Sequence, residues 1–90
     1  MMKRRTKLRI LADILRVLES GEANITKLMM EANLSYARLM RYLDELVEKE
    51  LVVREEDGRE VKYRITKRGR EFLREYERIM RIAEAFGVEI

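Results

Sequence analysis

Hydrophobic residues recur every three or four positions in the first half of the chain, which is the spacing of amphipathic helices. The first such stretch predicts a helix from about residue 6 to 20, which Gly21 ends in a left-handed conformation. A second, short helix is predicted from residue 25 to about 32, with Asn24 as its N-cap. The chain therefore begins with two helices separated by a short connection.

The third predicted helix runs from Ser35 to about residue 49 and has two different faces. Its inward-facing positions, spaced four, three and one residues apart, are Leu39, Leu43, Leu46 and Val47. Its opposite face carries Tyr36, Ala37, Arg38 and Arg41. Asn33 can take a left-handed turn conformation, and the Ser35 hydroxyl can accept a hydrogen bond from an amide of the first turn. Residues 33–43 therefore have the pattern of the turn and second helix of a helix-turn-helix.

Two stretches of β-type residues follow, at 51–55 and 60–65, and the Asp57-Gly58 pair between them is typical of a two-residue hairpin turn. If these two residues form the turn, Val52 lies opposite Tyr63. The residues expected to face the core are Val61, Tyr63 and Ile65, and those expected to face outward are Lys62 and Arg64. Three helices followed by such a hairpin predict a winged helix, a mostly α fold with a small β-hairpin.

The last predicted element is a long helix that begins at Thr66 and continues to about residue 86, where Gly87 ends it. Apolar residues spaced as in a coiled-coil seam lie along it, and they are Phe72, Tyr76, Ile79, Ala83 and Phe86. A domain of this size cannot cover the whole seam, so the seam predicts a homodimer formed through this helix. The alternative is that the helix packs back across its own domain. We expect one structural unit, with a winged helix at 1–66 and a dimerisation helix at 67–90.

Charge is distributed unevenly along the chain, although the formal net charge is only +3 over 90 residues. Residues 1–10 contain no acid, and their cations are Lys3, Arg4, Arg5, Lys7 and Arg9. A second basic cluster follows the hairpin at Lys67, Arg68 and Arg70. Basic clusters of this kind favour a polyanionic partner.

The outward face of the third helix carries side chains suited to contacting DNA. Arginine can donate two parallel hydrogen bonds to guanine, and tyrosine can reach a phosphate. No acid lies between Ser35 and Leu43, so this face can approach phosphates closely, although a solvated basic helix face would look the same. The predicted DNA contacts are Ser35, Tyr36, Arg38 and Arg41 on the helix, Lys62, Arg64 and Arg59 on the hairpin, and Lys27, Arg4 and Arg5 as non-specific contacts. Helix 35–49 is expected in the major groove, with hairpin 51–65 as the wing.

A protein-binding winged helix is the competing interpretation, docking through its hairpin or its last helix. The hairpin supports it, because its charges cancel: Arg54, Arg59, Lys62 and Arg64 stand against Glu55, Glu56, Asp57 and Glu60. A neutral wing is a weak phosphate clamp. The acid-free face of the third helix still favours double-stranded DNA as the partner.

Enzyme function is poorly supported, because the chain has no histidine, no cysteine and no glycine-rich phosphate loop. We expect no cofactor and no metal. The sequence also has no apolar run long enough for a signal core or a membrane span, which favours a cytoplasmic, nucleoid-associated protein. Charged residues make up 41% of the chain, a balance that favours a thermophilic source.

The chain resembles the small archaeal winged-helix DNA-binding proteins of about ten kilodaltons, the ten-a type. Two blocks carry the resemblance most specifically, Ala32-Asn33-Leu34-Ser35-Tyr36 and the Thr-x-x-Gly-x-x-Phe run from Thr66 to Phe72. The resemblance implies a homodimer that binds double-stranded DNA as a regulator or chromatin-like protein. One departure is Glu50, where such proteins usually have glycine. Since a left-handed residue other than glycine costs about 1 kcal/mol, we expect the third helix to end differently here.

Overall fold

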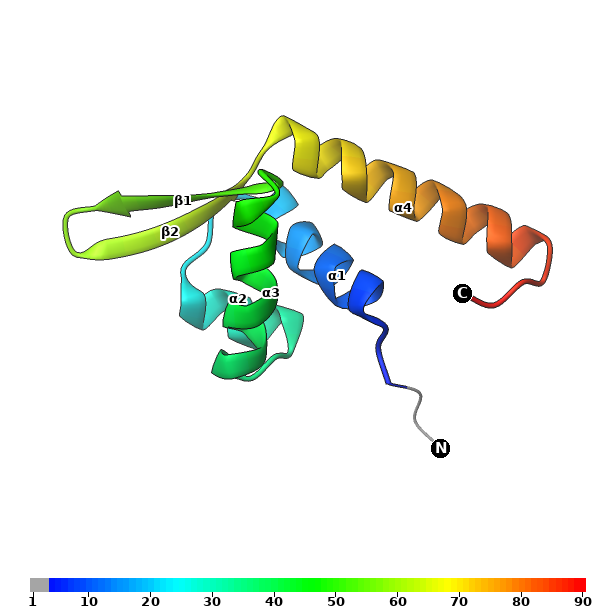
Figure 1. The fold of residues 1–90 in the computed structure, drawn as a ribbon, viewed down its shortest axis with the longest axis horizontal. Helices are drawn as coiled ribbons and strands as arrows, with labels where there is room; N and C mark the ends of the chain where they lie inside the picture. The colour runs from blue at the N-terminus through cyan, green and yellow to red at the C-terminus, as the bar shows by residue number, and fades with distance from the viewer. Residues whose placement is uncertain (1–3) are drawn as a thin grey trace.

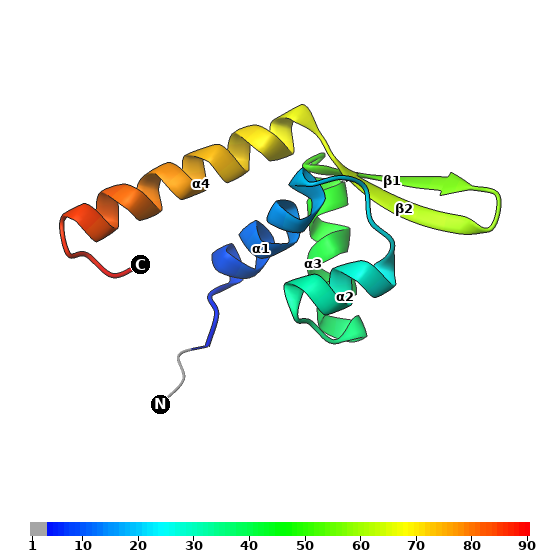
Figure 2. The ribbon, with the colours of Figure 1, turned by 180° about the vertical axis from the view of Figure 1, so that it is seen from behind.

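Residues 4–90, which the structure describes, form four helices and a two-stranded antiparallel hairpin in the computed structural model. In chain order the elements are α1 (Lys7–Glu19), α2 (Ile25–Ala32), α3 (Tyr36–Glu48), β1 (Val52–Asp57), β2 (Glu60–Ile65) and α4 (Lys67–Ala85). The hairpin extends to one side of the body formed by the first three helices, and the far end of α4 extends to the other side (Figures 1 and 2). This is the predicted winged helix with a long C-terminal helix.

Each helix begins after a side chain that caps it. In all four, the side-chain oxygen of the N-cap accepts a hydrogen bond, at 2.9 to 3.3 Å, from the backbone amide three residues later. The four caps are Thr6, Asn24, Ser35 and Thr66. Such a cap stabilises a helix by about 1 kcal/mol. The predicted caps at Asn24, Ser35 and Thr66 are confirmed.

The turn between α2 and α3 follows the sequence prediction. Asn33 has a φ of 55°, the left-handed conformation that asparagine tolerates better than most residues. The next residue, Leu34, donates its backbone N–H to the Met29 carbonyl at 3.0 Å and buries its side chain. These contacts fix how α3 leaves α2, and so fix which face of α3 remains exposed.

The C-terminus of α3 corrects the expectation for Glu50. Glu50 itself adopts the left-handed conformation, with a φ of 64°. Its N–H donates to the Val47 carbonyl at 3.0 Å and the Leu51 N–H donates to the Leu46 carbonyl at 2.9 Å, the hydrogen-bond pattern of a Schellman motif. The Thr66 hydroxyl also donates to the Glu50 carbonyl, at 2.8 Å. The expectation of a different helix end was wrong, because these bonds offset the backbone strain.

The hairpin register also differs from the prediction. Val52 pairs with Ile65, not with Tyr63, and Asp57 pairs with Glu60. The turn residues are therefore Gly58 and Arg59, and only Gly58 has a positive φ, 61°, as in a type II′ turn. The turn is displaced by one residue, which shifts the pairing by two. Because strand side chains alternate with a period of two, the predicted inward and outward faces are unchanged.

A third segment joins the hairpin through a single bridge that the sequence analysis did not predict. Ala23, between α1 and α2, exchanges two backbone hydrogen bonds with Tyr63, at 2.8 and 3.0 Å. Both residues are nearly fully buried. This bridge attaches the base of the wing to the first two helices.

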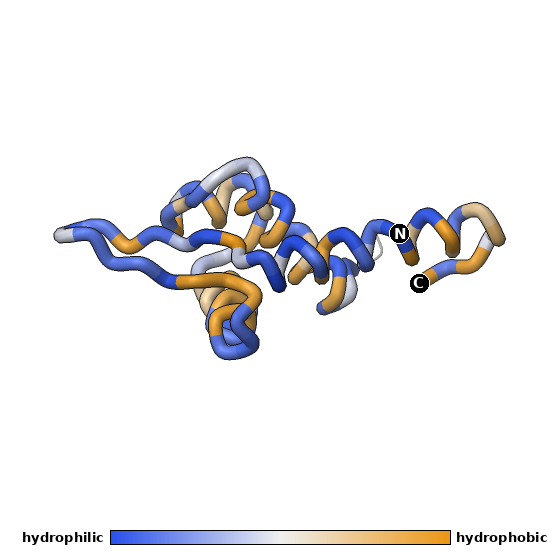
Figure 3. The backbone as a smooth tube through the Cα atoms, turned by 90° about the horizontal axis from the view of Figure 1, so that it is seen from above, coloured by the Kyte–Doolittle hydropathy of each residue, from blue (hydrophilic) through white to orange (hydrophobic). Residues whose placement is uncertain are grey.

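The hydrophobic core lies where the first three helices, the hairpin base and the first half of α4 meet. Side chains with 0% or 1% exposure in this core include Ile10, Ile14, Leu15, Leu28, Leu39, Leu43, Leu46 and Leu73. Viewed from above, the hairpin is largely hydrophilic, whereas hydrophobic and hydrophilic residues alternate along α4 (Figure 3). Among the described residues no polar or charged side chain is fully buried. The fold therefore rests on apolar packing, with its charges at the surface.

Candidate nucleic-acid interface

The outer face of α3 is exposed as the sequence pattern predicts. Leu39, Leu43 and Leu46 are buried, while Ser35, Tyr36, Ala37, Arg38 and Arg41 are exposed. Tyr36 is 59% exposed to solvent, which is high for an aromatic side chain. The Ser35 hydroxyl already accepts the capping bond from the Arg38 amide, at 3.3 Å, but its own proton remains available to a phosphate oxygen.

Two arginines on this face have no acidic partner within the part of the chain that the structure describes. Neither Arg38 nor Arg41 forms an ion pair there. The Arg41 guanidinium lies 5.8 Å from the centre of the Tyr42 ring, within the range of a cation–π contact. Their charge is therefore available to an outside anion.

The structure brings the N-terminal arm, defined here as residues 4–6, next to this face. A hollow of about 560 Å³ lies between the arm and α3, and we call it the arginine hollow. Its lining residues are Arg4, Arg5, Arg38, Arg41 and Tyr42. Four of the predicted DNA contacts thus share one cavity. Tyr42 was not among the predicted contacts, and its position next to Arg41 in the sequence was the available signal.

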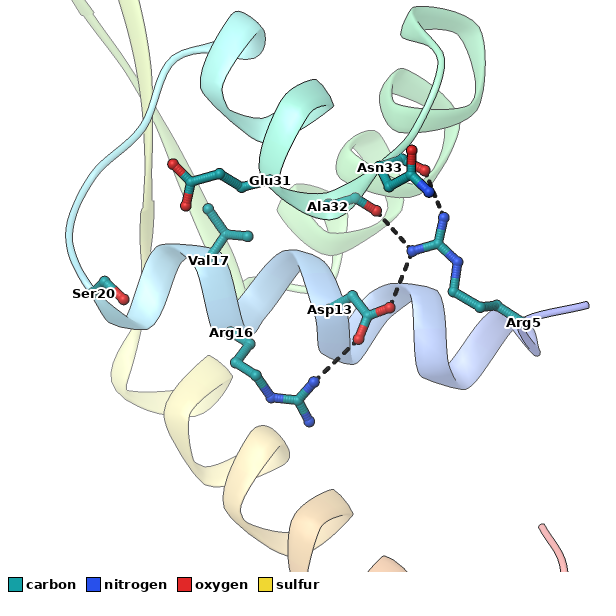
Figure 4. Close-up of a pocket in the computed structure, with 8 residues that line it drawn as sticks. All are labelled: Arg5, Asp13, Arg16, Val17, Ser20, Glu31, Ala32 and Asn33. Carbon is teal, nitrogen blue, oxygen red and sulfur yellow. Dashed lines mark hydrogen bonds and ion pairs between the residues drawn. The ribbon is translucent and has the colours of Figure 1, made fainter.

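Arg5 is held in place by the body of the protein. Its Nη1 donates to Asp13 Oδ2 at 3.0 Å and to the Ala32 carbonyl at 2.7 Å, and its Nη2 donates to the Asn33 carbonyl at 2.6 Å. Figure 4 shows this guanidinium facing the end of α2 on one side and Asp13 of α1 on the other. The carbonyls at the end of a helix carry partial negative charge, so Arg5 both caps α2 and anchors the arm.

Asp13 is a second residue that the sequence analysis did not single out. Its two carboxylate oxygens accept from Arg5 and from Arg16, at 3.0 and 3.1 Å, and Arg16 in turn reaches Glu77 of α4 at 3.4 Å. Its only sequence signal was an acid within the mostly apolar pattern of α1. Asp13 thereby joins the arm to a small ion-pair network on α1 and α4.

Two of the three predicted wing contacts, Lys62 and Arg64, are paired with carboxylates of the hairpin and of the segment between α1 and α2. Arg64 contacts Glu55 at 2.8 Å, and Lys62 contacts Glu22 at 3.4 Å and Glu60 at 3.8 Å. The hydrogen bond that Lys62 donates to Glu22 is the largest cause of the raised pKa of Lys62, and the bond that Arg64 donates to Glu55 raises the pKa of Arg64 in the same way. Both side chains are held in the charged form but are already paired.

The remaining predicted cations lie apart from the arginine hollow. Arg59 is exposed in the hairpin turn, and no ion pair of Arg59 is found in residues 4–90. Lys27 on α2 lies 3.9 Å from Glu31, one helical turn later. Lys3, part of the N-terminal basic cluster, lies outside the described residues. Among the predicted DNA contacts, the available positive charge is therefore concentrated on α3 and the arm.

The predicted seam of α4 is divided between this chain's own core and its surface. Tyr76 is buried in the core and Phe72 is half-buried against it, while Ala83 is buried outside the core cluster. Ile79, Ile82 and Phe86 remain 46%, 42% and 80% exposed. The first half of α4 is thus part of the domain, while its second half presents an uncovered apolar strip.

Neither a metal centre nor a membrane-spanning helix is found in the described residues. No group of three or more potential ligand side chains there is placed to hold a metal ion. None of the helices described is both long and apolar enough to cross a membrane.

Comparison with known proteins gives one family and several similar structures. The model of winged helix-turn-helix proteins matches residues 4–84. Sso10a-2, a DNA-binding protein from Sulfolobus solfataricus, is 28% identical over 91% of this chain and 85% of its own, with a TM-score of 0.83. This match confirms the resemblance that the sequence motifs indicate. No curated protein sequence matches the chain.

Two other solved structures show the same fold at lower identity. The transcriptional regulator BldR from Sulfolobus solfataricus is 24% identical over 88% of this chain and 60% of its own, with a TM-score of 0.77. ZitR from Lactococcus lactis, solved in complex with DNA, is 20% identical over 97% of this chain and 63% of its own, with a TM-score of 0.68. The described fold therefore recurs within longer proteins.

Proposed function

Because this chain belongs to the winged helix-turn-helix family, we propose that it binds double-stranded DNA as a homodimeric regulator or chromatin-like protein. In this proposal α3 enters the major groove and the β1–β2 hairpin lies along the backbone as the wing. Residues 1–66 bind the DNA, and residues 67–90 form the dimerisation helix. The similarity to Sso10a-2, whose name describes a DNA-binding protein, supports the same reading.

The observation that carries the proposal is the exposed face of α3. Arg38 and Arg41 are exposed and form no ion pair among the described residues, whereas Lys62 and Arg64 on the wing are paired with carboxylates. Arginine donates hydrogen bonds both to phosphates and to guanine, so these two side chains can position the helix and contact bases.

The test is a fluorescence-anisotropy titration of labelled duplex DNA over a series of salt concentrations. Each phosphate contact contributes a slope of about −0.9 to log K against log salt, so four contacts per dimer give about −3.6. Removing Arg38 and Arg41 together should weaken binding by roughly a hundredfold or more, on the basis of charged hydrogen bonds worth about 1.5–3 kcal/mol each.

A matched control keeps the same change of charge but places it elsewhere. Arg74 and Arg81 are exposed on α4, away from the predicted seam, and replacing both with alanine removes two positive charges as well. We expect this control to show only the small loss of DNA affinity that follows from its lower net charge. If the α3 variant and the control bind equally well, the assignment of α3 is wrong. If the folded wild-type protein fails to bind at low salt, the proposal itself is wrong.

A further inference from the structure

The arginine hollow gathers like charges around an open space. Four of its five lining side chains are arginines and none is acidic, and its volume of about 560 Å³ is many times that of one water molecule. The wing of the same molecule is built the opposite way, with Lys62 and Arg64 each beside a carboxylate. Guanidinium groups that face one another repel, and an anion placed between them reverses the sign of that interaction.

Arg5 offers hydrogen-bond donors that are already fixed in position. Its three bonds to Asp13, Ala32 and Asn33 all come from the two terminal nitrogens. A guanidinium carries five N–H groups, so the Nε–H and one terminal N–H remain, with no acceptor among the described residues. Only 22% of the side chain is exposed, so its orientation is set before any ligand arrives. Donors fixed in advance bind with a smaller loss of conformational entropy.

The other three arginines are placed to complete the same site. Arg38 and Arg41 are one helical turn apart and so lie on the same side of α3. The Tyr42 ring, 5.8 Å from the Arg41 guanidinium, restricts where Arg41 can go. Arg4 directly precedes the anchored Arg5, which keeps it at the edge of the hollow. None of these three forms an ion pair within residues 4–90.

We propose that the arginine hollow binds one backbone phosphate of the duplex, held jointly by the N-terminal arm and α3; this inference rests on the proposed function. The recognised chemistry is that of a phosphate oxyanion, because guanidinium groups match its geometry with pairs of N–H donors. A duplex is the source that the position favours, since Arg38 and Arg41 belong to the same face that is proposed to enter the major groove. The lining also provides nothing beyond Tyr42 that would recognise a larger metabolite.

One consequence is that Arg5 is a positioning residue for α3. It contacts the carbonyls of Ala32 and Asn33, which form the turn leading into α3, at 2.7 and 2.6 Å. A phosphate bound by Arg5 therefore has a fixed position relative to the backbone turn that orients α3. Phosphate contacts of this kind set the register of a protein on DNA without reading its sequence.

The first experiment uses inorganic phosphate and the full chain without DNA. The arginine Nε–H signals are followed by nuclear magnetic resonance during titration with phosphate, and in parallel with chloride at equal ionic strength. We expect saturable shifts at Arg5, Arg38 and Arg41 with phosphate only. The Arg4→Gln variant should weaken this saturation severalfold, whereas Arg74→Gln, a matched change on the exposed surface of α4, should leave it unchanged.

The second experiment measures duplex binding by the same two variants over a salt series. Losing one phosphate contact per protomer removes two per dimer, so Arg4→Gln should make the slope less steep by about 1.8. The loss of affinity should be similar for every DNA sequence, since a phosphate carries no base identity. Arg74→Gln should keep the wild-type slope.

The outcomes separate this inference from the proposed function. If the wild-type protein binds DNA but Arg4→Gln behaves as Arg74→Gln does, the phosphate site is overturned and the proposed function stands. If phosphate saturates the hollow but no duplex binds, the proposed function fails, and a free phosphate compound replaces the duplex as the source. If Arg4→Gln changes neither phosphate binding nor the salt dependence of duplex binding, the hollow is not an anion site.

Discussion

At the scale of single residues, Glu50 sits in a backbone conformation that suits glycine better. Its φ is 64°, and its side chain is exposed and forms no ion pair within the part of the chain that is described. Its hydrogen bonds, to the Val47 carbonyl in the Schellman motif and from the Thr66 hydroxyl, involve only its backbone. The side chain therefore adds strain and no visible compensating contact.

We predict that Glu50→Gly stabilises the protein by about 0.5–1 kcal/mol, the strain of a left-handed residue that carries a Cβ. Urea unfolding followed by circular dichroism measures this as a higher midpoint with an unchanged slope. Lys49→Gly is the control, because Lys49 has a φ of −86° and glycine there only adds freedom to the unfolded chain. A Glu50→Gly protein no more stable than wild type would mean that the side chain makes a stabilising contact.

Gly69 is required for a different reason, which is close packing. A Cβ at this position would collide with the backbone carbonyl of Leu51 and would lie 2.8 Å from Cγ1 of Ile65. This contact brings the first turn of α4 against the end of α3, where Thr66 caps one and bonds to the other. The glycine of the Thr-x-x-Gly-x-x-Phe motif thus allows α4 to dock.

We predict that Gly69→Ala destabilises the fold by about 1–3 kcal/mol, the usual cost of overpacking, although alanine is the better helix former. The opposing atom is backbone and cannot rotate away, which favours the upper end of that range. Arg70→Ala, one residue along the same helix and exposed, should change the unfolding midpoint little. Equal stability of the two variants would mean that α4 shifts freely on α3.

At the scale of elements, the wing differs from α3 in how its charges are arranged. Arg64 and Glu55 lie 2.8 Å apart with about half of each side chain exposed, 52% and 47%. Exposed pairs of this kind contribute little to stability, about 0–1 kcal/mol. Their main effect is to keep Arg64 occupied, so breaking the pair should convert the wing into a better phosphate contact.

We predict that Glu55→Gln strengthens DNA binding and steepens the salt dependence by about 0.9 for each released contact. Glu84→Gln, on an exposed position of α4, makes the same change in net charge and serves as the control. Anisotropy titrations of both variants with one duplex compare a local effect with a general one. If both variants gain the same DNA affinity, Arg64 does not lie next to the DNA.

The elements were predictable from the sequence where their signals are local. The caps at Asn24, Ser35 and Thr66 act over three residues, so the helix starts could be read directly. The hairpin register could not, because both Asp57-Gly58 and Gly58-Arg59 are plausible turns and the alternation of faces is the same for either. The left-handed conformation of Glu50 was not predicted, because part of the compensation for its strain comes from Thr66, sixteen residues away.

Only part of the candidate site was predictable, because again only local signals can be read from the sequence. The exposed face of α3 follows from helical periodicity, which a sequence displays openly. The arginine hollow depends on Arg5 reaching Ala32 and Asn33, 27 and 28 residues along the chain. Such a contact is set by tertiary packing and leaves no local pattern, so the arm could be called basic but not placed beside α3.

At the scale of the whole molecule, α4 combines two roles on different parts of its length. Leu73 and Tyr76 belong to the core, and their burial attaches the helix to the domain. Beyond them Ile79, Ile82 and Phe86 form an apolar strip that the described chain does not cover. A monomer that kept this strip in water would lose the free energy of burying it, at about 25 cal/mol for each Å². The strip therefore favours a second copy of the chain.

We predict that Ile79→Asp gives a folded monomer, because a charge on the strip cannot be buried unpaired in an interface. Ile79 is 46% exposed within its own chain, so the helical circular dichroism signal should persist. Sedimentation equilibrium should show the mass fall from two chains to one. Ala85→Asp adds the same charge to an exposed position away from the seam, and it should remain dimeric.

The same variant connects assembly to DNA binding. Two linked heads bind a duplex more tightly than one, by roughly 10²- to 10⁴-fold when both can engage at once. Ile79→Asp should therefore bind DNA more weakly and with about half of the wild-type salt slope, since each head keeps its own phosphate contacts. A folded Ile79→Asp protein with the mass of a dimer would place the interface elsewhere. A monomer with undiminished affinity would mean instead that one head alone accounts for binding, and that α4 serves a purpose other than joining two heads on one duplex.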